Sequence, residues 1–460
     1  MEQLAVHAAS VVIKVVSDGA GVFALLVLVS FFNKLELYAN QCAVLMEATI
    51  EAKEDVKGLD DHSSIAGSDS AHDTDDEESS DQSSMADCEN ADDEEPSSSL
   101  PATSLKSNKR PKFSIKPKFT KEDLPTDQIN SSFTYNEKSE WVLKKDYTPL
   151  TMFECFFDDD VISTIVRYSN KYALQTGKQI TVDANELKIV VAIIILSGYI
   201  PLARRRMFWE NAEDLHNQVV SSAMTVNRFE EILSILHLAD NTKLDLNDKM
   251  AKVRPILSML NERYLQFWPA SQNVNVDESM IPYYGRHSAK QFIRGKPIRY
   301  GYKMWCLNTP GGYLIQSEPY LGQGTVPIKP NLGMGGSVVV DLLSELPAQE
   351  FHVFTDNLFT SLALMSELRV MGMHGTGTLL ANRSAKCPLT LPQAMKKQPR
   401  GTMDYQLETT SNTVIVRWND NSVVTVASTG YGMQPLQKAK RWSREKKQFT
   451  TIPMPNAVAQ

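Results

Sequence analysis

The chain has 460 residues, a length that exceeds one ordinary domain and is sufficient for two sizeable cores. Its five cysteines lie far apart and form no CxxC pair, which excludes a disulfide framework or a zinc ribbon within the chain and fits a reducing compartment. The formal net charge of -8 conceals an uneven distribution. Residues 51–95 hold eighteen Asp or Glu and two Lys, so the rest of the chain carries +8 and forms a basic body.

An uncharged apolar run occupies residues 20–32 near the start of the chain. It is shorter than the ~20 residues that a helix needs to span a bilayer. No clean small-residue cleavage site follows it, so a secretory signal peptide is not indicated. We interpret residues 1–45 as an atypical extension, with Met46 as an alternative start and a membrane anchor as the alternative interpretation.

Residues 51–105 consist mainly of Ser, Asp and Glu. Such a segment buries too little apolar surface to offset its ordering entropy, so we expect it to be disordered. The stretch 106–121 then holds seven Lys or Arg and no acid. This basic cluster is typical of a nuclear-import signal or a phosphate-contacting arm, and a solvated linker is the alternative.

Helix-start signals mark the next part of the chain. Thr148-Pro149 provides an N-cap followed by proline at the first helical position. Further helices are expected to begin at Asp183, Thr225 and Pro255. Residues 148–268 are therefore expected to form a helical domain. Its basic groups are candidates for binding DNA phosphates or are ordinary surface charge; they are Arg204, Arg205, Arg206, Arg228, Lys252 and Arg254.

From residue 273 the apolar period changes to two, which predicts a strand over 273–277. Later segments alternate between strand and helix patterns and predict a mixed α/β domain. Strands are expected at 299–307, 312–321 and 351–355, helices at 337–346 and 360–371, and a β-rich stretch at 403–428.

Two acidic residues follow expected core strands. Asp277 ends the strand over 273–277, and Asp356 ends the strand over 351–356. Convergent carboxylates can hold Mg²⁺ or Mn²⁺ where a phosphodiester lies, and nucleases commonly use two such metals about 3.5–4 Å apart. We therefore predict that the two side chains lie together, with simple turn roles as the alternative. Glu278 is expected to face away from Asp277 and to be structural.

Several motifs resemble those of the piggyBac transposase family, in the right order and spacing. The matching stretches are 148–150, 227–229, 236–237, 276–282, 284–286, 296–303 and 355–361. The resemblance covers about residues 145–460. It implies an RNase H-like core with three acids of the DDE or DDD type, in which Asp277 is the first and Asp356 the second.

The resemblance also implies a split helical domain for dimerisation and DNA binding, and an insertion domain after about residue 385. Lys296, Arg299 and Lys303 follow the first acid and are expected either to touch DNA phosphates or to pair with the acidic core. The Mg²⁺ or Mn²⁺ site is expected to be incomplete, and no zinc site is expected in this chain.

The departure from the family lies at the end, because the third acid is expected beyond the segment 453–460. Asp404 and Asp420 remain as substitutes, but both fall in the expected insertion, and Asp420 fits a hairpin turn. His237 is expected to be a core histidine and Asp341 a solvated helix residue.

These observations predict an α/β protein with an RNase H-like core, a preceding helical domain, a β-rich insertion and a disordered acidic N-terminal region. The expected segments are 1–45, 46–145, 146–270, 271–384, 385–440 and 441–460, the last being the start of a return to the core. The expected function is that of a nuclear, transposase-derived protein that binds DNA and does not cleave it, and a homodimer is the expected partner arrangement. The alternatives are a fragment of an active cut-and-paste transposase, a chromatin or scaffold protein without catalysis, and a membrane-tethered product.

Overall fold

A computed structural model describes most of the chain after residue 148 and a short segment before it. The described ranges are 117–125, 149–200, 202–212, 215–268, 271–322, 325–443 and 447–460. The apolar run 20–32, the acidic segment 51–105 and most of the basic cluster 106–121 lie outside them. In the described part of the chain, no helix is long and apolar enough to cross a membrane.

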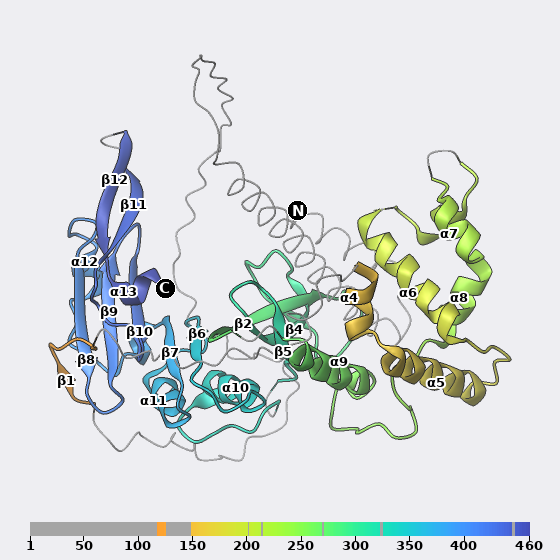
Figure 1. Cartoon of the computed structure of the whole chain (residues 1–460), viewed down its shortest axis with the longest axis horizontal. Helices are drawn as coiled ribbons and strands as arrows, with labels where there is room; N and C mark the ends of the chain where they lie inside the picture. The colour runs from red at the N-terminus through yellow and green to blue at the C-terminus, as the bar shows by residue number, and fades with distance from the viewer. Residues whose placement is uncertain are drawn as a thin grey trace, which may run out of the picture. The chain divides into compact units, whose positions relative to one another are not determined.

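The first half of the described chain is helical (Figure 1). Its helices are α4 (Pro149–Phe156), α5 (Asp159–Gln175), α6 (Ala184–Tyr199), the 3₁₀ helix η1 (Arg205–Trp209), α7 (Gln218–Ala223), α8 (Val226–Ile235) and α9 (Arg254–Gln266). Asp183 and Glu186 form the expected capping box at the start of α6. Thr225 caps α8 through the backbone N–H of Arg228.

A mixed sheet follows, and helices connect its parallel strands along the chain (Figure 1). Its strands are β2 (Asn273–Pro282), β3 (Gln291–Phe292), β4 (Tyr300–Asn308), β5 (Leu314–Pro319), β6 (His352–Thr355) and β7 (His374–Thr378). β2 pairs antiparallel with β4 and parallel with β6, which pairs parallel with β7. The helices α10 (Gly333–Ser344) and α11 (Leu362–Val370) precede β6 and β7, because parallel neighbours need a long crossover.

The β-rich stretch continues this sheet. β7 pairs antiparallel with β10 (Val423–Ser428), which pairs with β9 (Thr413–Asn419), then β8 (Met403–Glu408) and β1 (Phe119–Thr120). These strands complete a ten-stranded sheet among the described residues. The pairing covers the edge of β7, whose backbone N–H and C=O groups would otherwise lack partners on that side. Short helices lie at η2 (Ala381–Arg383), α12 (Pro392–Met395) and α13 (Asn456–Ala459).

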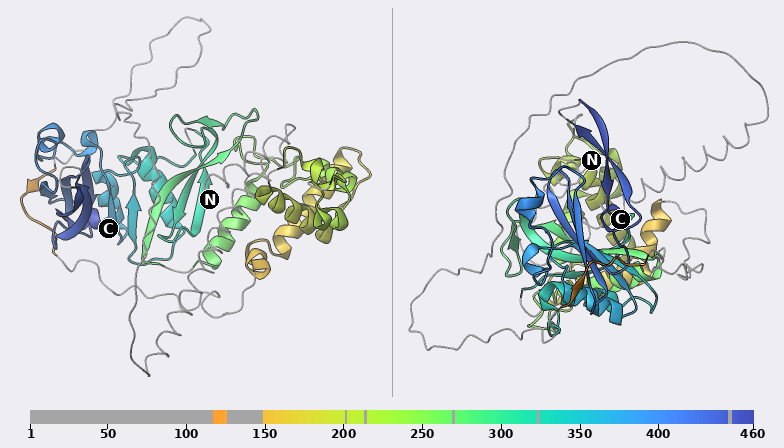
Figure 2. Two further views of the ribbon diagram at one scale, coloured as in Figure 1. Left: turned by 90° about the horizontal axis from the view of Figure 1, so that it is seen from above. Right: turned by 90° about the vertical axis from the view of Figure 1, so that its left-hand side faces the viewer.

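A separate two-stranded hairpin comes near the end of the chain. It consists of β11 (Gln437–Ser443) and β12 (Gln448–Met454), which pair with each other in antiparallel register. Figure 2 shows the pair in dark blue as a ribbon that extends past the neighbouring strands. Residues 441–454, expected to begin a return to the core, thus belong to this hairpin where the structure describes them.

The expected α/β fold is confirmed, and the expected strands and helices recur within a few residues of their predicted positions. The helices and the core strands share one apolar core, to which α6, α9 and β2 contribute buried side chains. Because residues 189–196 of α6 are apolar all around the helix, protein covers most of that stretch.

Candidate metal site

Asp277 and Asp356 lie side by side although 79 positions separate them. The parallel β2–β6 pairing runs from Asn273 opposite His352 to Val276 opposite Thr355. The next position along each strand is Asp277 on β2 and Asp356 directly after β6. Neighbouring strands are about 4.8 Å apart, and residues in equal register face the same side of a sheet. The structure therefore brings the two predicted acids together.

One prediction about Asp277 is wrong: β2 does not end there. β4 continues to pair with β2, with Asp277 opposite Cys306 and Pro282 opposite Gly301. A Cβ atom on Gly301 would lie 1.9 Å from the carbonyl oxygen of Ile281, so only glycine allows this close approach. Asp277 thus marks the end of the pairing with β6, and the antiparallel partner holds its backbone from the other side.

Hydrogen bonds within its own loop hold Asp356 in place. The backbone N–H of Leu358 donates to its carboxylate at 2.8 Å, and the hydroxyl of Thr360 donates to its carbonyl oxygen at 2.7 Å. Thr360 also shares a 2.8 Å hydrogen bond with Thr355. A Cβ atom on Gly377 of β7 would lie 2.3 Å from the Thr360 hydroxyl, so β7 packs directly against the loop.

Arg383 is a residue of the site that sequence reasoning missed. Its Nη1 atom donates to the carbonyl oxygens of Asn357 at 2.9 Å and Leu358 at 2.7 Å. Gly335 of α10 supports the same loop from another element, since a Cβ there would lie 2.8 Å from the Leu358 carbonyl oxygen. No local pattern around Arg383 indicates this role, because its partners come from 25 or 26 positions earlier in the chain.

The charges at the site repel one another. The pKa of the Asp356 carboxyl is raised, first by partial burial and then by the negative charges of Glu278 and Asp277, while backbone N–H groups, chiefly that of Leu358, oppose the shift. A divalent cation between the two aspartates would remove this repulsion. The donor set of two carboxylates fits Mg²⁺ or Mn²⁺, which prefer oxygen ligands.

Glu278 is held by lysines. Its carboxylate lies 3.1 Å from the Nζ atom of Lys303 and 3.4 Å from that of Lys296. Of the two roles expected for these lysines, pairing with the acidic core is therefore the one seen. Arg299 is exposed and makes no ion pair within the part of the chain that the structure describes.

Two of the candidate DNA-binding arginines are engaged by glutamates. Arg228 binds Glu186 through two hydrogen bonds of 2.7 Å, and Arg206 binds Glu230 through bonds of 2.7 and 2.5 Å. Arg204 is exposed and has no acidic partner among the residues described. Arg204 and Arg299 are thus exposed candidates whose guanidinium groups have no acidic partner there.

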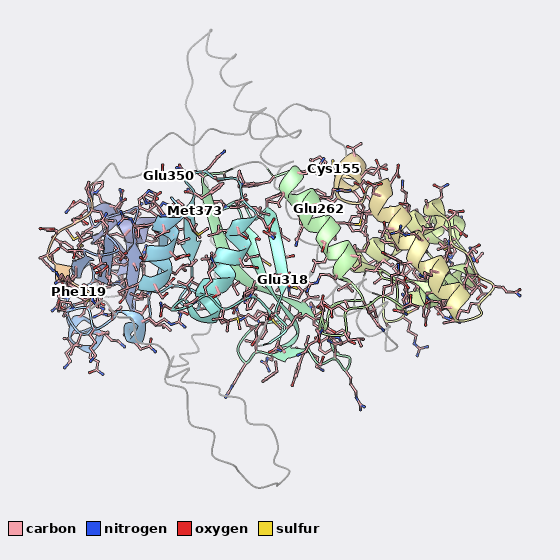
Figure 3. All side chains as sticks on the ribbon, turned by 90° about the horizontal axis from the view of Figure 1, so that it is seen from below. Phe119, Cys155, Glu262, Glu318, Glu350 and Met373 are labelled. Atoms are coloured by element: carbon pink, nitrogen blue, oxygen red, sulfur yellow. The ribbon has the colours of Figure 1, made fainter. Side chains whose placement is uncertain are left out.

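The remaining basic groups of the helical region differ in environment. Arg205 lies over the ring of Phe229 at 5.2 Å. Burial lowers the pKa of Arg205, and the negative charge of Glu230 opposes this shift. Arg254 binds Asp248 at 2.7 Å and also pairs with Glu318, which Figure 3 labels. Lys252 is exposed.

A hollow in the helical region lies among these charges and is distinct from the metal site. It has a volume of about 580 Å³, and Arg167, Lys171, Asp240 and Asp248 are among the residues that line it. Lys171 binds Asp240, and Asp248 binds Arg254, so its charges are largely compensated. His237 stacks on Tyr172 nearby, and burial lowers its pKa, as for a core histidine.

The substitute acids are occupied elsewhere. Asp404 binds Lys121 and accepts the N–H of Thr390, and Asp420 binds Arg400 and Arg441. Asp341 lies exposed on α10. Across the residues that the structure places, no three Asp, Glu, His or Cys side chains gather closely enough to hold a metal ion.

Comparison with known proteins agrees with this fold. A piggyBac transposase, solved as a synaptic complex with hairpin DNA, matches with a TM-score of 0.54 at 21% identity, covering 66% of this chain and 64% of that one. Residues 148–459 match the family model described as Transposase IS4. Fold and sequence therefore define a transposase-like DDE domain.

The human PiggyBac transposable element-derived protein 3 is 42% identical over 355 residues, which cover 76% of this chain and 59% of the relative. The human PiggyBac transposable element-derived protein 2 is 41% identical, with 76% and 60% covered. The chain belongs to the piggyBac-type transposase family. It spans about three fifths of the length of these relatives.

Proposed function

We propose that this transposase-derived chain binds DNA, holds a divalent cation between Asp277 and Asp356, and does not cleave DNA by itself. The equal register of these two acids on parallel strands carries the proposal. Carboxylates converge at such a point at the cost of mutual repulsion, which a bound cation relieves. The basic body, with Arg204 and Arg299 exposed, supports attraction of DNA phosphates.

Each residue of the site has a distinct part in this proposal. Asp277 and Asp356 would hold the cation, while Arg383 and Thr360 fix the loop that carries Asp356. A divalent cation supplies charge stabilisation at a phosphoryl oxygen when it is bound. Lys296 and Lys303 neutralise Glu278 and so limit the negative charge that DNA phosphates would meet.

The proposed lack of cleavage follows from the donor set. Cleavage by two metals requires both the attacking and the leaving oxygen to be aligned. Two carboxylates leave a second cation poorly fixed, and Asp404 and Asp420 are bound to basic groups elsewhere. Among the described residues a third acid does not join the pair.

Binding of Mn²⁺ to the purified 460-residue chain tests the cation site by calorimetry. We expect one equivalent to bind and the melting temperature to rise with it. Asp277→Asn or Asp356→Asn should abolish both effects. The matched control is Asp341→Asn, which removes an exposed carboxylate from α10 and should leave both unchanged. Equal Mn²⁺ binding by all four proteins would refute the site.

The other functions expected from the sequence give different results with the same proteins. A fragment that retains cut-and-paste activity would nick DNA in Mn²⁺, and the nicking would require Asp277. A chromatin or scaffold protein without catalysis would bind DNA with no dependence on Mn²⁺ or on Asp356. Nuclear import directed by the basic cluster 106–121 is likewise proposed, from its sequence alone.

A further inference from the structure

The β11–β12 hairpin has two faces of opposite character. Cross-strand partners lie on the same face, as do residues two apart on one strand. Lys440 lies opposite Thr451, and Trp442 lies opposite Phe449. We define the outer face of the hairpin as Lys438, Lys440, Trp442, Phe449, Thr451 and Pro453.

The inner face fixes the hairpin to the sheet. Ala439 and Ile452 are buried against Trp418 of β9. The indole N–H of Trp418 donates to the carbonyl oxygen of Pro453 at 2.9 Å, and Arg441 binds Asp420 at 2.8 Å. Because these contacts hold the hairpin from one side, its outer face is presented on a supported ribbon.

The outer face exposes two large aromatic rings beside two lysines. The exposed fractions of Trp442 and Phe449 are 50% and 63%, and their ring centroids are 5.2 Å apart at an interplanar angle of 74°. Lys440 lies 5.9 Å from the Phe449 ring. Lys438 and Lys440 form no ion pair within the described ranges. Exposed aromatics beside unpaired positive charges indicate a binding surface.

We infer that the outer face of the hairpin is a second DNA-binding surface, which takes DNA with unpaired bases. This inference rests on the proposed DNA binding. Lys438 and Lys440 are two residues apart on one strand, so their Cα atoms are separated by about 7 Å, and both ammonium groups can bind phosphates of one strand. Trp442 and Phe449 offer rings on which bases stack, and bases become available for stacking when they are unpaired.

The composition of the face argues against other occupants. Of these six residues, Pro453 alone has an aliphatic side chain, whereas a protein groove for a partner helix buries several. A two-stranded ribbon also has the dimensions of elements that enter DNA grooves. Asp277 and Asp356 lie in a different part of the sheet, between β2 and β6, so the hairpin adds a contact that the metal site does not supply.

Fluorescence anisotropy with two labelled probes tests the inference on the full chain. One probe is a 30-base-pair duplex, and the other is the same duplex with four central bases unpaired. We expect tighter binding of the second probe. Trp442→Ala combined with Phe449→Ala should reduce that preference at least 10-fold while changing duplex affinity less than 2-fold. Trp442→Leu, which keeps apolar area without a planar ring, should reduce it as well.

The lysines are tested by the salt dependence of binding. Lys438→Gln combined with Lys440→Gln should weaken binding of both probes and lower the slope of log Kd against log salt by about 2. The matched control is Lys396→Gln with Lys397→Gln, the same change in charge at two exposed lysines near α12. The control should leave the preference and the slope unchanged.

The outcomes separate this inference from the proposed function. If the unaltered chain binds neither probe, the proposed DNA binding fails together with the inference. If it binds both and every hairpin variant behaves as the control does, only the inference is overturned. The same proteins are also mixed with vesicles containing 30% phosphatidylserine. If the unaltered chain binds the vesicles and the hairpin variants do not, while all of them bind DNA equally, the inference is overturned in favour of a membrane surface.

Discussion

At the scale of single residues, Arg383 determines how the Asp356 loop is held. Its guanidinium donates to two successive carbonyl oxygens, at 2.9 and 2.7 Å, and so fixes the backbone that carries the carboxylate. It acts through the backbone of the loop and is a positioning residue. Groups that orient a metal ligand in this way typically contribute 10- to 100-fold to metal affinity.

We therefore predict that Arg383→Ala weakens Mn²⁺ binding at least 10-fold, measured by calorimetry. Arg383→Lys should restore part of the affinity, because an ammonium group can donate to one of the two carbonyls. Arg299→Ala removes an exposed arginine without an acidic partner in the described structure and serves as the control. Unchanged Mn²⁺ affinity in Arg383→Ala would contradict the positioning role.

His352 gives the molecule a pH-dependent stability. It is fully buried, donates or accepts one hydrogen bond of 2.8 Å with Thr376, and stacks on Phe354 and Tyr431. Burial, and then the charge of His374, lowers its pKa to about 3. Above the unfolded pKa of about 6.5 both states are neutral and the group contributes nothing. Below it the unfolded state takes up a proton that the folded state refuses, so stability falls.

We predict that His352 costs about 2 kcal/mol of stability between pH 6.5 and pH 5, from a slope of about 1.4 kcal/mol per pH unit. Urea unfolding of the chain at pH 7.5 and pH 5 measures the difference. His352→Gln should show a smaller loss over that interval, whatever its stability at pH 7.5. An identical loss in both proteins would show that the buried imidazole does not titrate as described.

Local patterns predicted the two acids, but not their surroundings. The pairs Val276-Asp277 and Thr355-Asp356 each mark a strand followed by an acid, a signal contained in a few adjacent residues. The extension of β2 to Pro282 depends on β4, and the support from Arg383 depends on a turn far along the chain. Such contacts have no periodicity in the sequence.

At the scale of elements, the cap of α6 and the start of α8 are joined by one ion pair. Glu186 closes the capping box of α6 and also binds Arg228, the third residue of α8, through two hydrogen bonds. The Arg228 guanidinium also donates to the carbonyl oxygen of Thr181 at 2.6 Å. The pair lowers the pKa of Glu186 and thus favours its charged form. Arg228 therefore serves the packing of two helices.

We predict that Arg228→Ala lowers the free energy of unfolding by about 1–2 kcal/mol, since it leaves a half-buried carboxylate without its partner. It should change the salt slope of DNA binding little. Arg204→Ala removes an exposed arginine with no acidic partner in the described residues. It should lower the salt slope of DNA binding and change the free energy of unfolding little. Urea unfolding and anisotropy on the same two variants provide the comparison. If both variants lowered the salt slope of DNA binding equally, Arg228 would be a DNA contact.

The pairing of whole strands was less predictable than the strands themselves. Runs of Val, Ile and Thr on either side of the turn 419–421 predicted β9 and β10. Their attachment to β7 follows from the open edge of a parallel strand, and the sequence of 403–428 contains no sign of which edge it completes. For the same reason, the sequence does not show that 437–443 and 448–454 pair with each other as a hairpin.

At the scale of the whole molecule, opposite charges are separated along the chain. The segment 51–95 carries -16, and the rest carries +8. Both the metal site and the hairpin belong to the basic part. Attraction to DNA is thus expected to depend strongly on salt, because each phosphate that is neutralised releases a counterion. DNA binding requires positive charge on this surface, whereas DNA cleavage also requires well-fixed cations.

The 460-residue chain should bind DNA without cutting it. Asp277 and Asp356 can attract one cation, but alignment of both the attacking and the leaving oxygen supplies much of the rate and needs a second, well-fixed cation. In the described structure no third acid completes the pair. The measurement is a nicking assay in Mg²⁺ or Mn²⁺ on DNA with TTAA sites, the target that the family resemblance implies, and Asp277→Ala is the control. Robust nicking that this substitution abolishes would show that another residue supplies the third ligand, and Glu278, released from Lys296 and Lys303, would be the first to substitute.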